Sequence, residues 1–341
     1  MPQAEADSQV PAVTAVRALA DHGITRAAVA CGVFDGLHLG HLDVMRALRA
    51  AAARHAAAPV VLTFDPNPAA VVNADSPPDR LLSAAHQRRC FARLGIRAVV
   101  SIPFTPAFAA RTREQFINED VLGAPVQIAA ICVGRNWRFG AGETGDTAYL
   151  HGRAARDGFE LVAVAERRDR DGRVISATAV RRALAAGELD RVNALLGRPY
   201  ALYGPVIAGK GLGRREVGFA TANIAIAGRL VPPAGVYAAR AVLDGGRLDG
   251  ILYHGPAPTL RPRAGEAVEP VVELHLFDFD ADVYGRELEV EFLAAIRGSR
   301  RFASSAALHE QISQDIDAAK RIHHERPPAR CGTIEEPAYA I

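Results

Sequence analysis

Short apolar segments alternate with helical patterns along the first half of the chain. Runs of apolar residues without strict alternation predict buried strands at 27–33, 59–64, 98–102, 128–133 and 160–165. Between these runs, apolar residues recur at helical spacing over 41–55, 84–94 and 112–121. Strands that alternate with helices favour a parallel sheet covered on both faces, so we expect an α/β domain over residues 12–197.

The pattern changes near Arg198-Pro199-Tyr200. Strand-like runs with Gly and Pro between them follow at 204–207, 235–242, 250–253, 271–277 and 287–292, and a helical pattern covers 304–321. This order predicts a mostly antiparallel barrel or sandwich with one C-terminal helix, over residues 198–325. The proline-containing segment 326–341 is expected to be a loose tail.

Composition narrows the class of protein. The 341 residues are 49% hydrophobic and 23% charged, a balance typical of globular domains, and their length indicates two of them. A formal net charge of +2 gives no electrostatic reason to expect nucleic acid or an anionic membrane as a partner. The four cysteines form no C-x-x-C pair, and no apolar run approaches the ~18 residues of a membrane span. We therefore expect a cytoplasmic protein, whose oligomeric state the sequence leaves open.

A glycine-rich segment, Cys31 to His41, follows the first predicted strand and opens the first helix. Gly32 and Gly36 allow a tight turn and a close approach of the backbone to a ligand, and Gly40 leaves room at the start of the helix. A helix N-terminus offers free N–H groups and a positive dipole end, which suit a phosphate. His38 and His41 are spaced to share one face there, where both could donate hydrogen bonds to that phosphate.

Other interpretations of the two histidines have to be weighed. Histidines at this spacing on a helix are more often surface residues, and a metal-binding pair is a further alternative. Their position at a strand–helix junction, with glycine before and between them, favours a functional role.

A second segment, Ile175 to Arg181, combines hydroxyl groups with a cation at the start of a helical pattern. Ser176 is suited to cap that helix, and Arg181 is suited to form a forked pair with phosphate oxygens. Taken alone, the segment is better explained as an ordinary helix start.

Together the two segments resemble the Rossmann-like H-x-G-H nucleotidyltransferases, whose second motif is I-S-x-T-x-x-R. More closely, the chain resembles the bacterial bifunctional riboflavin kinase/FMN adenylyltransferase (FAD synthetase) family, in colinear order from about residue 25 to about 323. Further segments that carry the resemblance are Thr63-Phe64-Asp65-Pro66, residues 133–140 and residues 195–200.

For the first domain, the resemblance implies that the phosphate of FMN attacks the α-phosphate of ATP, giving FAD and pyrophosphate. His38 and His41 would hold the transferring phosphate, and Ser176, Thr178 and Arg181 the leaving one. The remaining implied ATP-binding residues are Gly32, Phe34, Asp35 and Gly40, and the implied flavin-binding residues are Pro66, Asn67, Asn136 and Arg138. Asn67 departs from the family, which usually has histidine there; an amide donates a hydrogen bond but carries no charge.

For the second domain, the resemblance implies a riboflavin kinase barrel that uses ATP and Mg²⁺. Residues 218–223 resemble a G-F-P-T-A-N motif, in which Gly218 would contact the nucleotide and Thr221 and Asn223 would bind the metal. Glu273, in a segment that matches the catalytic strand, would be the general base. Without the resemblance, Glu273 is better explained as an exposed strand carboxylate, and Thr221 and Asn223 as part of a turn.

Three departures from the family concern the kinase. Ala220 replaces the usual proline, the glycine spacing in 213–218 differs by about one residue, and His254 and Ala257 stand where asparagine and arginine are expected. Lys210 does not indicate a Walker motif, because no Ser or Thr follows it.

The sequence leaves four hypotheses open. They are a two-step enzyme from riboflavin to FAD; an FAD synthetase whose barrel only binds or regulates flavin, or acts on a flavin analogue; a non-catalytic flavin sensor; and an adenylyltransferase for another phosphorylated acceptor. The intact H-x-G-H and I-S-x-T-x-x-R motifs argue against the sensor.

Overall fold

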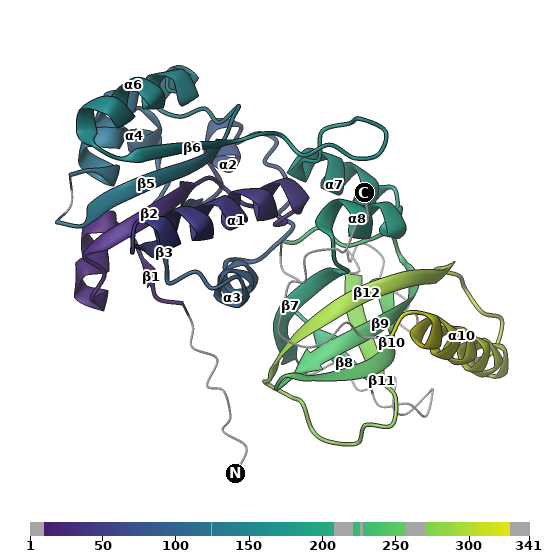
Figure 1. The fold of residues 1–341 in the computed structure, drawn as a ribbon. Helices are drawn as coiled ribbons and strands as arrows, with labels where there is room; N and C mark the ends of the chain where they lie inside the picture. Colours follow the sequence, from purple (N-terminus) through teal and green to yellow (C-terminus); the bar gives the residue numbers. More distant parts are fainter. Residues whose placement is uncertain (1–9, 124, 208–220, 226–227, 257–269, 328–341) are drawn as a thin grey trace, which may run out of the picture. The chain divides into compact units, whose positions relative to one another are not determined.

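The chain divides into two compact units in a computed structural model, which describes residues 10–327 except 124, 208–220, 226–227 and 257–269 (Figure 1). The first unit comprises residues 1–79 and 87–177, and the second comprises residues 80–86 and 178–341. Each unit is described separately below.

A parallel sheet forms the centre of the first unit. Its strands lie in the order β1-β4-β3-β2-β5-β6 and every neighbouring pair is parallel. The strands are β1 (Ala12–Val13), β2 (Arg26–Cys31), β3 (Ala58–Asp65), β4 (Ala98–Pro103), β5 (Gln127–Gly134) and β6 (Glu160–Val164). Ala28, Val29 and Ala30 of β2 are all fully buried, as expected for a strand covered on both faces.

Helices cover this sheet (Figure 1). α1 (Leu39–Arg54) packs against β2, β3, β5 and β6. A hydrophobic cluster packs sheet residues such as Val29 and Leu62 against Leu19, Phe116 and Leu150 from the helical segments. The other helical segments are η1 (Val16–His22), α2 (Pro68–Val72), α3 (Ala84–Arg93), α4 (Pro106–Ala109), α5 (Arg113–Gln115), η2 (Phe116–Val121), η3 (Ala141–Glu143) and α6 (Thr147–Asp157).

The strand order identifies where a ligand would bind. From β2 the chain goes outward to β3 and β4 on one side, and it later fills β5 and β6 on the other. In open α/β sheets the ligand crevice lies outside the carboxyl ends of the strands at such a reversal. The segments that follow β2, β3 and β5 therefore converge on one end of the sheet, and they contain His38, His41, Asn67 and Asn136.

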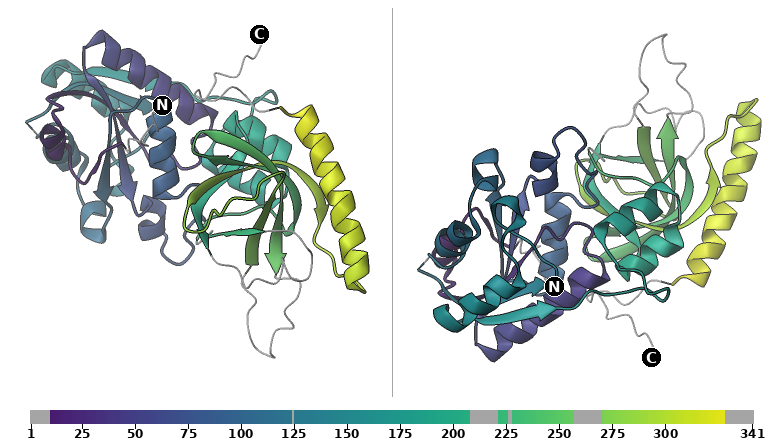
Figure 2. Two further views of the ribbon diagram at one scale, coloured as in Figure 1. Left: turned by 90° about the horizontal axis from the view of Figure 1, so that it is seen from below. Right: turned by 90° about the horizontal axis from the view of Figure 1, so that it is seen from above.

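A closed antiparallel barrel forms the centre of the second unit, with strands in the order β10-β11-β8-β7-β12-β9. The strands are β7 (Tyr200–Ile207), β8 (Ala222–Ile224), β9 (Gly235–Leu243), β10 (Gly246–Pro256), β11 (Pro270–Leu276) and β12 (Glu287–Gly298). In both views of Figure 2, α10 (Ser305–Glu325) lies along the outside of the barrel, where it packs against β9, β10 and β12. Two further helices, α7 (Ala177–Ala185) and α8 (Leu189–Leu196), precede β7.

Residues 80–86 come from the middle of the first domain's sequence but pack with the barrel strands. The Tyr200 hydroxyl lies 3.2 Å from the Leu81 carbonyl oxygen and 2.6 Å from the Leu230 carbonyl oxygen. Inside the same unit, His86 Nε2 lies 3.2 Å from a carboxylate oxygen of Glu289 on β12, and both side chains are buried.

The expected fold class is confirmed, with a parallel α/β sheet followed by a barrel and a C-terminal helix. Several details differ from expectation, including the short strand β8 and the longer strands β7 and β10. β12 continues past the bulge at Phe292 to Gly298, α10 ends at Glu325, and the segment expected as a plain helix over 112–121 widens into a π-helical turn in η2. The expected tail lies outside the described residues from 328 onward. Among the described helices, none is long and apolar enough to cross a membrane.

Candidate active sites

The turn between β2 and α1 has an unusual backbone. Phe34 and Leu37 have positive φ angles of 54° and 43°, and Gly36 has a φ of 79°. Each left-handed residue other than glycine costs about 1–3 kcal/mol and persists only when its surroundings hold it in place. Two such residues in one short turn indicate a conformation that the rest of the domain stabilises.

The Phe34 ring covers Gly32. A Cβ atom on Gly32 would lie 2.9 Å from Phe34 Cζ, closer than side-chain atoms pack, so no other residue fits there without movement of the ring. The ring also meets the edge of His41, with centroids 5.2 Å apart and planes at 77°. Phe34 therefore connects the glycine turn to the second histidine.

The two histidines stand together at the start of α1. Their rings stack with centroids 3.6 Å apart. His38 is the N-cap residue, and its Nδ1 accepts a hydrogen bond of 3.3 Å from the backbone N–H of His41. Because Nδ1 accepts, the neutral His38 ring carries its proton on Nε2. His38 is buried and His41 is half-buried, so the pair combines one fixed ring with one more accessible ring.

Gly40 allows the second motif to approach. A Cβ atom at Gly40 would lie 3.3 Å from the His38 ring and 3.6 Å from the carbonyl oxygen of Ile175. The start of the Ile175–Arg181 segment therefore lies beside the histidines, as the pairing of the two motifs predicts.

The rest of that segment enters α7. Ser176 directly precedes the helix, while Thr178 and Arg181 are spaced to share one face of its first turns. Thr178 is exposed and Arg181 is half-buried. Their proposed contact with the leaving phosphate stays a prediction.

The expected flavin-binding residues follow β3 and β5. Pro66 is exposed, and Asn67 is the N-cap of α2, where its side-chain oxygen accepts a 3.0 Å hydrogen bond from Ala69 N. Past β5, Asn136 donates a 2.7 Å hydrogen bond to Glu166, and Arg138 forms a 3.0 Å ion pair with Asp146. The structure thus gives Asn67 a local capping role that the sequence comparison with histidine does not suggest.

The described kinase residues lie on neighbouring strands of the barrel. Asn223 on β8 is directly opposite Glu273 on β11, and Tyr253 on β10 is opposite Glu273 on its other side. Thr221 lies two residues before Asn223, at the entry to β8, so the two side chains share a face. Burial raises the pKa of the Glu273 carboxyl above its ordinary value. The proposed metal ligands and base are therefore brought together.

His254, one of the departures, lies on β10 next to Tyr253. It is half-buried, and burial lowers its pKa, although the Pro232 and Pro233 carbonyls act in the opposite direction. Burial therefore favours the neutral imidazole at the position where asparagine is expected, so His254 adds no positive charge for a phosphate. Gly218, Ala220, the rest of 213–218, Lys210 and Ala257 lie outside the described residues.

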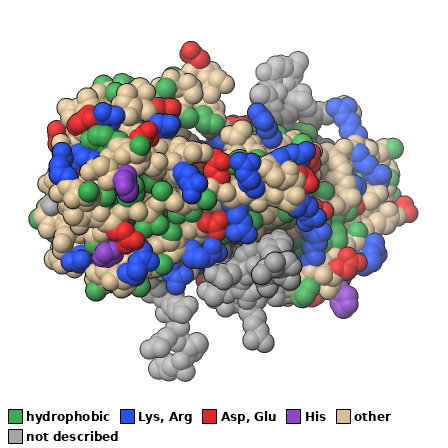
Figure 3. Space-filling model, turned by 45° about the horizontal axis from the view of Figure 1, so that its top comes forward, with side chains coloured by type: hydrophobic (Ala, Val, Ile, Leu, Met, Phe, Trp, Pro, Cys, Tyr) green, Lys and Arg blue, Asp and Glu red, His purple; other side chains and the backbone are tan. Residues whose placement is uncertain are grey.

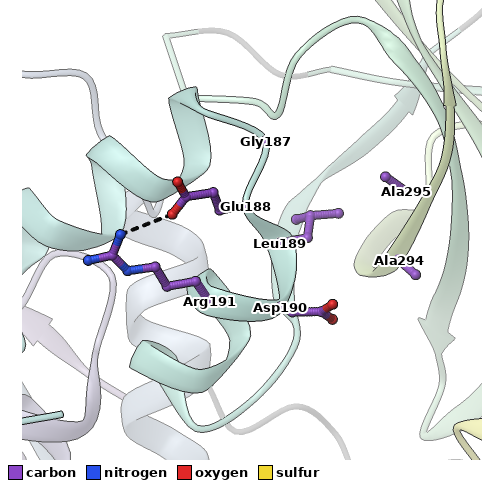
Figure 4. A pocket seen from close by; sticks show the side chains of 7 residues that line it. All are labelled: Gly187, Glu188, Leu189, Asp190, Arg191, Ala294 and Ala295. Atoms are coloured by element: carbon purple, nitrogen blue, oxygen red, sulfur yellow. Dashed lines mark hydrogen bonds and ion pairs between the residues drawn. The ribbon is translucent and has the colours of Figure 1, made fainter. Parts of the chain in front are cut away.

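A recess of about 420 Å³ in the second unit is lined by none of the candidate site residues (Figure 4). Figure 4 shows the ion pair between Glu188 and Arg191 beside it, at 3.0 Å. Its lining residues are Gly187, Glu188, Leu189, Asp190, Arg191, Ala294 and Ala295, and none was singled out from the sequence.

Charged side chains of both signs are interspersed over much of the face seen in Figure 3.

Among the described residues, no group of three or more His, Cys, Asp or Glu side chains could hold a metal ion.

Comparisons with known proteins show which families the two parts of the chain match. A family model described as FAD synthetase matches residues 21–179, and one described as riboflavin kinase matches residues 196–323. The chain is 34% identical over 299 residues to the bifunctional riboflavin kinase/FMN adenylyltransferase of Escherichia coli (strain K12), covering 87% of this chain and 93% of that protein. It is 32% identical over 298 residues to the protein of the same name from Bacillus subtilis (strain 168), covering 87% and 92%.

A solved structure has a similar fold. The crystal structure of a protein named macrolide-efflux protein from Streptococcus pneumoniae superposes with a TM-score of 0.74 and 25% identity, covering 91% of this chain and 98% of that one. The similarity extends across both units of the chain.

Proposed function

Because the chain belongs to the bifunctional riboflavin kinase/FMN adenylyltransferase family, we propose that it converts riboflavin to FMN in the barrel and FMN to FAD in the α/β domain. The observation that carries the proposal is that the histidine pair, the proposed kinase base and the proposed metal ligands all lie in the two domains that match the family. ATP is a substrate of both reactions, and the flavins are substrates and products.

In the α/β domain, an oxygen of the FMN phosphate attacks the α-phosphorus of ATP, and the bond from that phosphorus to the bridging oxygen of pyrophosphate breaks. No covalent bond to the enzyme is needed, so positioning and charge stabilisation carry the reaction. His38 and His41 donate hydrogen bonds to the transferring phosphate at the start of α1, where the helix N-terminus adds a positive potential. Ser176, Thr178 and Arg181 bind the departing pyrophosphate.

Gly32, Phe34, Asp35 and Gly40 shape the turn that receives ATP. Asp35 is buried, as is His38, while the two glycines allow the Phe34 ring, the His38 ring and the Ile175 carbonyl oxygen to pack closely against the backbone. Pro66, Asn67, Asn136 and Arg138 lie after strands of the same sheet and form the flavin side. Arg138 is exposed and exchanges Asp146 for the FMN phosphate in this proposal.

In the barrel, Glu273 accepts the proton of the ribityl hydroxyl as that oxygen attacks the γ-phosphorus of ATP, with ADP as the leaving group. The raised pKa of Glu273 makes it a stronger base than an exposed glutamate. Thr221 and Asn223 offer the hard oxygen ligands that Mg²⁺ prefers, beside the base. When bound, Mg²⁺ supplies positive charge that offsets the charge of the ATP phosphates.

One test separates the two steps. Purified protein receives Mg-ATP with riboflavin in one tube and with FMN in another, and the products are separated by chromatography. FAD in both tubes is the expected result. Absence of FAD in both would overturn the flavin assignment and leave another phosphorylated acceptor.

A second candidate function is FMN adenylyl transfer alone, with the barrel kept for flavin binding or regulation, or adapted to a flavin analogue. The observation that favours it is His254, which stands where the family has asparagine and whose burial lowers its pKa, so that the neutral imidazole is favoured. This candidate predicts FAD from FMN and none from riboflavin. Ala220→Pro would then restore kinase turnover if the missing proline is the defect.

A further inference from the structure

Two side chains converge on one backbone oxygen beside the histidine site. Gln87 Nε2 donates a 2.8 Å hydrogen bond to the Val33 carbonyl oxygen, and Thr63 Oγ1 donates to the same oxygen over 3.2 Å. Gln87 is 9% exposed and Thr63 is 3% exposed. A buried amide and a buried hydroxyl therefore both donate to the Val33 carbonyl oxygen.

That acceptor controls the shape of the turn. The Val33 carbonyl belongs to the peptide group that precedes Phe34, and the orientation of this group sets the φ angle of Phe34. Phe34 is the first left-handed residue after β2, with a φ of 54°. Within the sheet, the Val33 oxygen would be held by a neighbouring strand; two side-chain donors hold it here while the backbone leaves the sheet.

The donors come from different elements. Thr63 is on β3, beside β2, whereas Gln87 is on α3, far along the chain. Phe91 is one helical turn after Gln87 and therefore on the same face of α3. Its buried ring meets the Phe34 ring edge-on, with centroids 6.1 Å apart, and Phe34 in turn contacts His41. One face of α3 thus supports both the backbone and the ring of Phe34.

We propose that Gln87 is a positioning residue for adenylyl transfer. It holds the Val33 carbonyl and thereby keeps Phe34 left-handed and the His41 ring in place for the transferring phosphate. Gln87 touches no substrate and acts through Val33 and Phe34. This inference rests on the proposed function of the α/β domain.

The test uses Gln87→Met in the full chain, because methionine keeps the length and the apolar stem but loses the donor. The second donor is tested with a matched pair of variants: Thr63→Val removes the hydroxyl and Thr63→Ser keeps it. We expect Gln87→Met to lower kcat for FMN adenylylation about tenfold, with KM for ATP changed less than about threefold. Thr63→Ser should keep wild-type kcat, while Thr63→Val should lower it. The double variant Gln87→Met/Thr63→Val should lose more than the product of the single effects, since the two donors share one acceptor.

Two controls separate positioning from folding. Trp137 is the single tryptophan and lies in the first unit, so its fluorescence follows the thermal unfolding of that unit. The rate of FMN formation from riboflavin reports whether the barrel is folded and active. Wild-type kcat in Gln87→Met would overturn the inference, as would a loss of kcat that Thr63→Val and Thr63→Ser share equally. If wild-type protein made no FAD from FMN, the proposed function would fail as well, which distinguishes that outcome from failure of Gln87 alone.

Discussion

The imidazole rings of His38 and His41 lie stacked at the start of α1, 3.6 Å apart between centroids and 22° apart in plane. The backbone N–H of His41 donates to His38 Nδ1, so the first ring caps the helix that carries the second. His41 therefore has two separate roles, one for its backbone N–H and one for its side chain. The backbone of His41 fixes His38, whereas the side chain of His41 has the proposed role at the transferring phosphate.

His41→Ala removes the second role and leaves the first, because alanine keeps the backbone N–H that binds His38. We expect the rate of FMN adenylylation to fall by about 10²–10³-fold, as is typical when one donor to a developing charge is lost. Conversion of riboflavin to FMN should be unchanged. Both rates are measured on one preparation, with the exposed His151→Ala on α6 as the matched control. Equal loss of both activities would show that the two domains do not work independently.

Gly40→Ala tests how closely the two motifs approach. In a helix interior, alanine is favoured over glycine by up to about 1 kcal/mol; Gly40 is the second residue of α1, so alanine there should not destabilise the helix itself. The new methyl group, however, would lie 3.3 Å from the His38 ring and 3.6 Å from the Ile175 oxygen, so the ring must shift. We expect adenylyl transfer to fall at least tenfold, without loss of thermal stability.

Gly152 on α6 provides the control for Gly40. It is exposed, and a Cβ atom there would meet nothing within 4 Å. Gly152→Ala should therefore raise the free energy of unfolding by about 0.5–1 kcal/mol and leave both activities unchanged. Full activity in Gly40→Ala would mean that the His38 ring position does not matter for the reaction.

The sequence predicts the layers of this fold well, because buried parallel strands are apolar on both faces and stand out against helical spacing. It does not reveal β8, since Ala222–Ile224 is too short to show a period of two. Nor does it place residues 80–86 with the barrel, because that depends on non-local partners such as the Tyr200 hydroxyl and the Leu81 carbonyl. Contacts of this kind leave no local pattern.

In the candidate site, too, the sequence reveals some residues and not others. His38 and His41 are recognisable because a glycine turn at a strand–helix junction is a local signal, and so is the pairing with Ile175 once both motifs are known. The support from Gln87 is invisible in the sequence: a glutamine on an amphipathic helix normally indicates a solvated face. Its role follows only from its 2.8 Å contact with Val33.

Glu273→Gln should separate activity from stability in the barrel. The amide cannot accept the ribityl proton as a base, so FMN formation from riboflavin should fall by about 10²-fold or more, with adenylylation of supplied FMN unchanged. Burial raises the pKa of Glu273, which means that folding favours the neutral acid over the carboxylate. At neutral pH the glutamine variant should therefore be at least as stable as the wild type in thermal unfolding. Intact FMN formation in this variant would rule out Glu273 as the base.

The same raised pKa predicts a pH dependence. A group with a raised pKa in the folded protein contributes stability below its unfolded pKa, and loses that contribution as pH rises through the folded value. The kinase rate has the opposite pH dependence and rises with pH, because the proposed base must be ionised to accept a proton. The kinase rate should therefore fall on acidification at a pH above the ordinary glutamate range, while the adenylylation rate follows a different profile. A kinase profile flat down to pH ~4 would contradict the assignment, since that is the ordinary glutamate range.

His86 and Glu289 form the last testable pair, inside the second unit. Their 3.2 Å contact joins the 80–86 segment to β12, with only 1% of His86 and 5% of Glu289 exposed. Because His86→Ala removes a hydrogen-bond partner from a buried carboxylate, we expect it to lower the free energy of barrel unfolding by about 1–3 kcal/mol. Urea unfolding followed by circular dichroism measures the change, with the exposed His324→Ala on α10 as the control. Equal stability of the two variants would mean that the buried pair does not anchor the segment to the barrel.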